Sequence, residues 1–93
     1  GEAARLAPQE ARYRAHFGAA LSRDKATRRQ AESELQAAIA LDAGNASYHV
    51  MLAELYGEVG LRRKAEAELE RALALEPAHA AARRLLEELR RAG

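Results

Sequence analysis

Three histidines and three serines are the side chains of this sequence that could bind a metal ion or serve as a catalytic base and nucleophile: His16, His49, His79, Ser22, Ser33 and Ser47. No histidine has a partner at the i, i+4 spacing of a helix, no HExxH motif occurs, and the chain has no cysteine. Zinc sites need clustered Cys and His ligands, and a nucleophilic serine needs a sharp turn and a positioned base. The sequence therefore predicts no metal, no cofactor and no catalytic residue.

Clusters of basic residues could bind phosphates if they formed one stripe. They are Arg28-Arg29, Arg62-Arg63-Lys64, Arg83-Arg84 and Arg90-Arg91. The formal net charge is only +1, and glutamates are interleaved with the clusters: Glu32, Glu34, Glu66, Glu68, Glu70, Glu87 and Glu88. Mixed charges at helical spacing are typical of a solvated helix face. We therefore expect these glutamates to be exposed and expect no nucleic-acid partner.

The composition favours helices. The chain has 24 Ala, 13 Leu and 13 Arg but only four β-branched residues among 93. Ala, Leu and Arg are strong helix formers, whereas Val, Ile and Thr favour strands. No stretch approaches the roughly 18 apolar residues of a membrane span. We predict an all-α chain, one small domain at most, with no membrane segment and a cytoplasmic location. Many Arg and few Lys indicate a bacterial coding sequence.

The chain repeats itself. Gln30–Asn45 matches Lys64–His79 at a spacing of 34 residues, whereas Tyr13–Leu21 matches Tyr48–Tyr56 at a spacing of 35. The register therefore slips by one residue, which places an insertion in the segment 22–27. Pro8 is expected to lie in the first turn of a helix. Apolar stripes at helical spacing predict five helices: Tyr13/Phe17/Ala20/Leu21, Ala31/Leu35/Ala38/Ile39, Tyr48/Leu52/Leu55/Tyr56/Val59, Ala65/Leu69/Ala72/Leu73 and Ala82/Leu85/Leu86/Leu89.

Both copies carry one spaced motif. The second reads His49-x2-Leu52-Ala53-x2-Tyr56, Ala65-x3-Leu69 and Pro77; the first reads Arg14-x2-Phe17-Gly18-x2-Leu21, Ala31-x3-Leu35 and Ala43. The pattern resembles the tetratricopeptide repeat (TPR), although Arg14 and His49 stand where that family usually has Trp, and Ala43 replaces a proline. The resemblance implies antiparallel helix hairpins stacked as a short right-handed superhelix of about five helices. It divides the chain into 1–8 (the tail of a preceding repeat, or an end segment), 9–45 (repeat 1), 46–79 (repeat 2) and 80–93 (capping helix).

Small residues recur where the two helices of each hairpin should cross. A large side chain would push the helix axes apart there, so we expect close contact at Gly18, Ala31, Ala38, Ala53, Ala65 and Ala72.

The resemblance also implies a partner-binding groove, because the first helix of each TPR pair lines a concave face. The implied groove residues are Arg12, Ala15, His16, Ala19, Arg23, Val50, Met51, Glu54, Glu58, Arg84, Leu85 and Glu88. Val50, Met51 and Leu85 would form an apolar centre inside a rim of mixed charge. The Lys, Asn and Arg with which some TPR proteins clamp the carboxylate of chaperone peptides are not found, because those places hold Ala15, Ala19, Met51, Ala81 and Leu85.

These expectations favour a non-catalytic protein-interaction module, part of a longer protein, that binds a peptide or a partner helix in the groove. The alternative that the partner binds another face of the chain stays open. The alternative is a structural segment whose open end stacks on a neighbouring domain or on a second copy as a homodimer.

Overall fold

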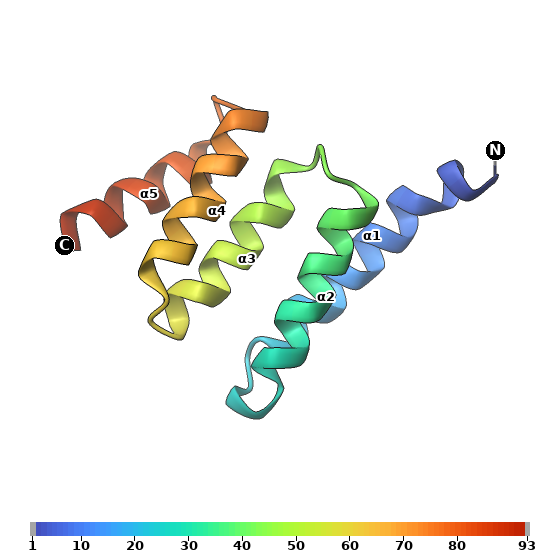
Figure 1. Ribbon diagram of the computed structural model, residues 1–93, viewed down its shortest axis with the longest axis horizontal. Coiled ribbons are helices and arrows are strands. Elements are labelled where there is room, and N and C mark those ends of the chain that lie inside the picture. Colours follow the sequence, from blue (N-terminus) through green and yellow to red (C-terminus); the bar gives the residue numbers. More distant parts are fainter. Residues whose placement is uncertain (1, 93) are drawn as a thin grey trace. The chain divides into compact units, whose positions relative to one another are not determined.

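Five α-helices and one short 3-10 helix make up the part of the chain that the structure describes (Figure 1). A computed structural model describes residues 2–92, with side chains from residue 9 onward. The elements are α1 (Glu2–Leu21), the 3-10 helix η1 (Lys25–Thr27), α2 (Arg28–Leu41), α3 (Ala46–Glu58), α4 (Arg62–Leu75) and α5 (Ala80–Ala92). No strand occurs in this range, so the predicted all-α class is confirmed. None of the helices described has the length and apolar character of a membrane span.

The helices form two compact units, Gly1–Gly44 and Asn45–Gly93. The first, which we call the N-terminal hairpin, consists of α1 packed directly on α2, with η1 in the connection between them. The second, the C-terminal unit, consists of α3, α4 and α5, with α4 packed against both others. In each unit a short connection makes consecutive helices run back alongside one another (Figure 1).

The N-terminal hairpin is held by small residues. Ala11, Ala15 and Gly18 recur at helical spacing on α1 and are buried, and α2 offers Ala31 and Leu35, which are 0% and 1% exposed. A Cβ atom added to Gly18 would lie 3.0 Å from Leu35 Cγ and 3.2 Å from the Ala31 carbonyl oxygen. The predicted close contact of the two helices at Gly18 and Ala31 is therefore confirmed.

The prediction that the stripe with Tyr13 and Phe17 is the buried face of α1 is wrong. Tyr13 and Phe17 are 67% and 40% exposed. Helix α1 carries two apolar stripes, one of Ala and Gly and one aromatic, and close approach to α2 is possible only through the smaller side chains. The aromatic pair consequently faces outward.

The start of α1 also differs from the expectation. The helix begins at Glu2 and continues through Pro8, so Pro8 does not mark a first turn. Residues 2–7 include Glu, Ala, Arg and Leu, which are strong helix formers and extend the helix toward the N-terminus. Side chains of residues 1–8 are outside the described part of the chain, and the assignment of this segment to a preceding repeat stays a prediction.

The inserted segment between α1 and α2 folds into η1. Asp24 accepts a hydrogen bond from the Ala26 N–H at 2.9 Å and caps the 3-10 turn. The Thr27 hydroxyl donates to the Leu21 carbonyl at 2.6 Å, which satisfies a carbonyl left open where α1 ends. The extra residue of the first copy is thus absorbed by a capped turn.

The equivalent turn between α3 and α4 ends on a glycine. Gly60 has φ +81°, a left-handed conformation that costs other L-residues about 1–2 kcal/mol. It lets the Leu61 N–H reach the Tyr56 carbonyl at 2.8 Å, the bond that closes a helix end of this kind. The two hairpins thus turn by different local chemistry.

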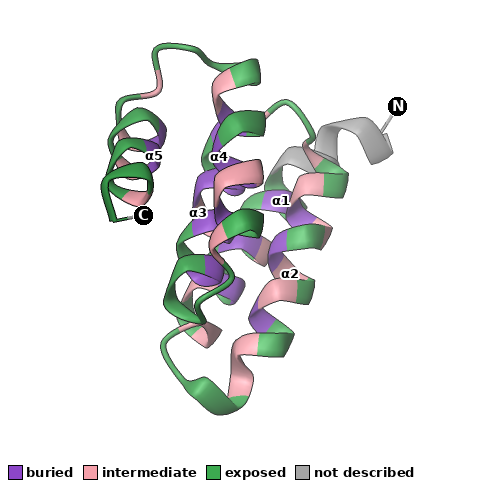
Figure 2. Cartoon of the chain, turned by 60° about the vertical axis from the view of Figure 1, so that its left-hand side comes forward, coloured by how far each residue is buried: buried purple, intermediate pink, exposed green. Residues whose placement is uncertain are grey.

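The core of the C-terminal unit is built from buried residues of α3, α4 and α5 (Figure 2). Leu69, Ala65 and Ala72 of α4 are 0–1% exposed, while Ala82 and Leu86 are the buried residues of α5. Every position at which the sequence predicted a small contact residue is buried: Gly18, Ala31, Ala38, Ala53, Ala65 and Ala72.

Candidate functional site

A buried polar pair joins α3 to α4. His49 and Glu68 are 8% and 6% exposed, and His49 Nδ1 lies 2.8 Å from Glu68 Oε1. The other carboxylate oxygen of Glu68 accepts a hydrogen bond from the Arg71 guanidinium one turn along α4. The expectation that Glu68 belongs to a solvated charged face is therefore wrong, because a histidine on the facing helix offers it a hydrogen-bond partner inside the hairpin.

The N-terminal hairpin has a counterpart at the matching positions. Arg14 on α1 pairs with Glu34 on α2 at 3.0 Å and with Glu10 at 3.0 Å. Arg14 lies 35 residues before His49, and Glu34 lies 34 residues before Glu68, which are the two spacings of the internal repeat. A basic residue on the first helix and a glutamate on the second therefore occur at matching positions of both copies. Aligning both helices of the two copies at once would have revealed this recurrence in the sequence.

These pairs hold helices together rather than present reactive groups. The ring of His49 and the carboxylate of Glu68 have side-chain exposures of 11% and 8%, so a substrate has little access to either. Hydrogen-bonded partners offset the cost of burying such polar groups.

Ser47 and His79 are the one serine–histidine contact that the structure records in its described part, with Oγ and Nε2 3.3 Å apart. His79 Nδ1 accepts a hydrogen bond from the Ala82 N–H at 3.2 Å, which caps the start of α5. In the neutral ring the proton is then on Nε2, so His79 donates to Ser47 and cannot take its proton. The contact is a helix cap, not an activated nucleophile.

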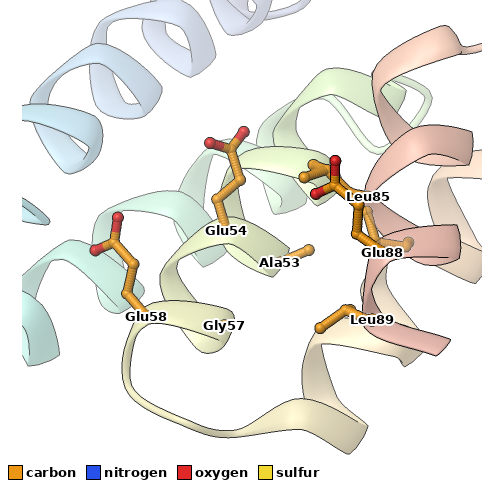
Figure 3. A pocket seen from close by; sticks show the side chains of 8 residues that line it. Ala53, Glu54, Gly57, Glu58, Leu85, Glu88 and Leu89 are labelled. Atoms are coloured by element: carbon orange, nitrogen blue, oxygen red, sulfur yellow. The ribbon is translucent and has the colours of Figure 1, made fainter. Parts of the chain in front are cut away.

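A pocket of about 370 Å³ lies in the C-terminal unit between α3 and α5 (Figure 3). We call it the α3–α5 pocket. Its lining residues are Ala53, Glu54, Gly57, Glu58, Leu69, Leu85, Glu88 and Leu89. Leu69 of α4 is 1% exposed, while Leu85 and Leu89 of α5 are half-buried. The three leucines and Ala53 give the pocket an apolar interior, and the glutamates stand on its helical walls.

The structure brings four of the predicted groove residues together in this pocket. They are Glu54 and Glu58 of α3 and Leu85 and Glu88 of α5. Met51 is half-buried and Arg84 exposed, and neither lines the pocket. The groove residues predicted in the first copy lie on α1 or just after it, in the N-terminal hairpin: Arg12, Ala15, His16, Ala19 and Arg23.

Two predicted groove residues are corrected by their burial. Ala15 is 2% and Val50 4% exposed, so neither offers surface to a partner. Ala15 belongs to the small-residue stripe of α1. Val50 follows buried Tyr48 and His49 in the chain, so α3 is covered on more than one face at this point.

Sequence reasoning missed four pocket residues: Ala53, Gly57, Leu69 and Leu89. Ala53 and Leu69 were assigned to the core, and they contribute to both core and pocket. Gly57 and Glu58 lie three and four residues after Glu54, on the same side of a helix, so a helical projection of α3 would have found Gly57. Leu89 required the position of α5 against α4.

The charge of the pocket also differs from the expected mixed rim. Its lining contains three glutamates and no Lys, Arg or His. Of the arginines expected in the rim, Arg84 is outside the lining, and Arg12 and Arg23 belong to the N-terminal hairpin. The pocket is apolar inside and acidic at its edge.

No group of three His, Cys, Asp or Glu side chains suited to a metal ion occurs within the described residues. Comparison with protein-family models, with curated proteins and with solved structures finds no match to this chain.

Proposed function

We propose that this chain is a non-catalytic protein-interaction module of TPR-like helix hairpins, and that its C-terminal unit binds a peptide or partner helix in the α3–α5 pocket. The observation that carries the proposal is the pocket itself, in which four of the groove residues expected from the TPR resemblance meet. The recurrence of the Arg14–Glu34 and His49–Glu68 pairs at repeat spacing supports the relation between the hairpins.

The size and lining of the pocket suit side chains of a peptide. Ligand pockets span roughly 300–1,000 Å³, and about 370 Å³ is at the small end of that range. Leu85 and Leu89 are only half-buried, so an apolar side chain placed on them would remove further apolar surface from water. Recognition of an amphipathic segment between two helices follows this principle.

Filling the pocket tests the proposal without removing a core side chain. A Cβ atom on Gly57 or on Gly44 would have no neighbour within 4 Å, but only Gly57 lines the pocket. Peptides selected from a random library on the wild-type chain are the probes, and fluorescence anisotropy measures their affinity. Gly57→Leu is expected to weaken binding at least about tenfold, a loss of about 1.4 kcal/mol, whereas Gly44→Leu leaves it unchanged. Equal affinity in both variants would refute the pocket as the binding site.

A second candidate function rests on the outward aromatic pair of α1. The rings of Tyr13 and Phe17 are stacked, with centroids 6.3 Å apart and planes at 4°. The repeat-equivalent residues Tyr48 and Leu52 are 8% and 2% exposed, against 67% and 40% here. An exposed apolar pair at positions that are covered in the other copy is suited to stacking on a neighbouring domain or a second copy.

Sedimentation equilibrium tests whether the chain self-associates, because it measures the fraction of dimer at each concentration. The wild-type chain is expected to form a dimer whose fraction rises with concentration, because pairing would bury the aromatic faces. A variant carrying Tyr13→Ser and Phe17→Ser should stay monomeric and keep its helical circular dichroism. A wild-type chain that is monomeric at millimolar concentration excludes the second-copy form of this function.

A further inference from the structure

The α3–α5 pocket combines an apolar interior with carboxylates on its walls. Glu54 and Glu58 are four residues apart on α3, a spacing at which like charges destabilise a helix. Glu88 adds a third carboxylate from α5, and Figure 3 shows Glu54 and Glu88 on opposite walls with Leu85 and Leu89 on the α5 side. Glu58 is also the last residue of α3, where the negative end of the helix dipole lies.

Three cations that lie close in sequence to the pocket residues have partners of their own. Arg62 donates to the Leu89 carbonyl and lies 3.8 Å from Glu66. Arg90 lies 3.6 Å from Glu70, and the Lys64 ammonium stands 5.6 Å from the centre of the Tyr56 ring. Within the described residues, the structure records no ion pair of Glu54 or Glu88 with any of them. The carboxylates of Glu54 and Glu88 can therefore pair with a cation from outside the chain.

We propose that the α3–α5 pocket takes a cationic segment of a different protein. One aliphatic side chain of that segment would lie on Leu69, Leu85 and Leu89, and flanking Lys or Arg side chains would face Glu54 and Glu88. This inference names the partner of the proposed binding function and rests on it. Charge complementarity of this kind gives specificity and speeds association.

A second copy of the chain is a poorer occupant. The segment Leu61–Lys64 has a suitable composition, since Leu61 is 43% exposed and three cations follow it. Two of those cations already have partners, however: Arg62 binds Glu66 and the Leu89 carbonyl, and Lys64 contacts Tyr56. Nucleic acid would be repelled by the glutamates. A basic, partly apolar peptide satisfies both features of the pocket.

The composition of selected peptides tests the inference. A random peptide library displayed on phage is selected on the wild-type chain and counted by sequencing. We expect enrichment of sequences with one aliphatic residue flanked by Lys or Arg. Enrichment of acidic or uncharged peptides that Gly57→Leu still blocks would overturn the cationic partner while leaving the binding function intact. If the wild-type chain enriches no peptides beyond those that the Gly57→Leu variant enriches, both the cationic partner and the binding function are overturned.

Charge removal within the pocket provides the second measurement, on one selected cationic peptide. A variant carrying Glu54→Gln and Glu88→Gln is expected to bind about 3- to 10-fold more weakly, as two exposed ion pairs allow. Glu87→Gln is the matched control, because Glu87 is exposed on α5 but does not line the pocket. Added salt should weaken the wild type more than the double variant. Equal losses in the double variant and in Glu87→Gln would contradict the proposal.

Discussion

Replacing His49 with alanine is expected to lower the free energy of unfolding by about 2–4 kcal/mol. The substitution removes the 2.8 Å contact with Glu68 and leaves one oxygen of a carboxylate that is 6% exposed without its partner. A buried polar atom that loses its hydrogen bond costs its full desolvation energy. Chemical denaturation followed by circular dichroism measures the change.

Two further variants separate this mechanism from a general loss of packing. Arg14→Ala, at the equivalent position of the N-terminal hairpin, should cost only about 0–1 kcal/mol, because Arg14 has 39% side-chain exposure and water can replace it. Replacing His49 and Glu68 together with leucine should cost less than His49→Ala, since no buried polar atom is then left unpaired. A His49→Ala loss no larger than that of Arg14→Ala would show that the buried pair does not stabilise the hairpin.

Gly18→Leu is expected to destabilise the N-terminal hairpin by about 3 kcal/mol through overpacking. Its Cβ alone would meet Leu35 Cγ at 3.0 Å and the backbone oxygen of Ala31 at 3.2 Å. Leu35 is 1% exposed and has no free space into which to move. Hydrogen exchange of the α2 amides, together with chemical denaturation, reports the loss.

Gly57→Leu is the matched control for Gly18→Leu. Both glycines lie in helices, so the gain of about 0.5–1 kcal/mol from replacing a helical glycine applies to both. Gly57 has open space around its Cβ position, and its variant should be as stable as the wild type or slightly more so. If both variants had the same stability, close contact of α1 with α2 at Gly18 would be disproved.

The helices and their contact positions were predictable because they depend on local periodicity. The 34-residue spacing aligned Ala31 with Ala65 and Ala38 with Ala72, and all four are at most 1% exposed. A small residue repeated at one register position has few explanations besides close helix contact, so the sequence was sufficient there.

The sequence did not predict which face of a helix is buried where the helix carries two apolar stripes. Tyr13 and Phe17 have the spacing of a core stripe, but Ala11, Ala15 and Gly18 allow the closer approach to α2 and are buried instead. Glu68 was misjudged for the opposite reason. Its neighbours in sequence suggest a charged surface, and only the facing His49 reveals that it is buried and paired.

The candidate site was predictable in part. The TPR resemblance assigned Glu54, Glu58, Leu85 and Glu88 to one groove, and these four residues line one pocket of the structure. To predict the remaining lining residues and the charge of the pocket, one would need to know how α5 packs on α4, which no local sequence pattern encodes. Arg84 is exposed outside the pocket although it directly precedes Leu85, so α5 contributes a glutamate to the lining but no arginine.

Methyl NMR of the leucine-labelled chain tests the binding site most directly. Titration with a peptide selected on the wild type should shift the methyl signals of Leu69, Leu85 and Leu89, which line the pocket. Signals of Leu35 in the N-terminal hairpin and of Leu75, 44% exposed on α4, should stay in place, and Gly57→Leu should abolish the shifts. Shifts confined to leucines outside the pocket, or equal shifts in the Gly57→Leu variant, would contradict the account.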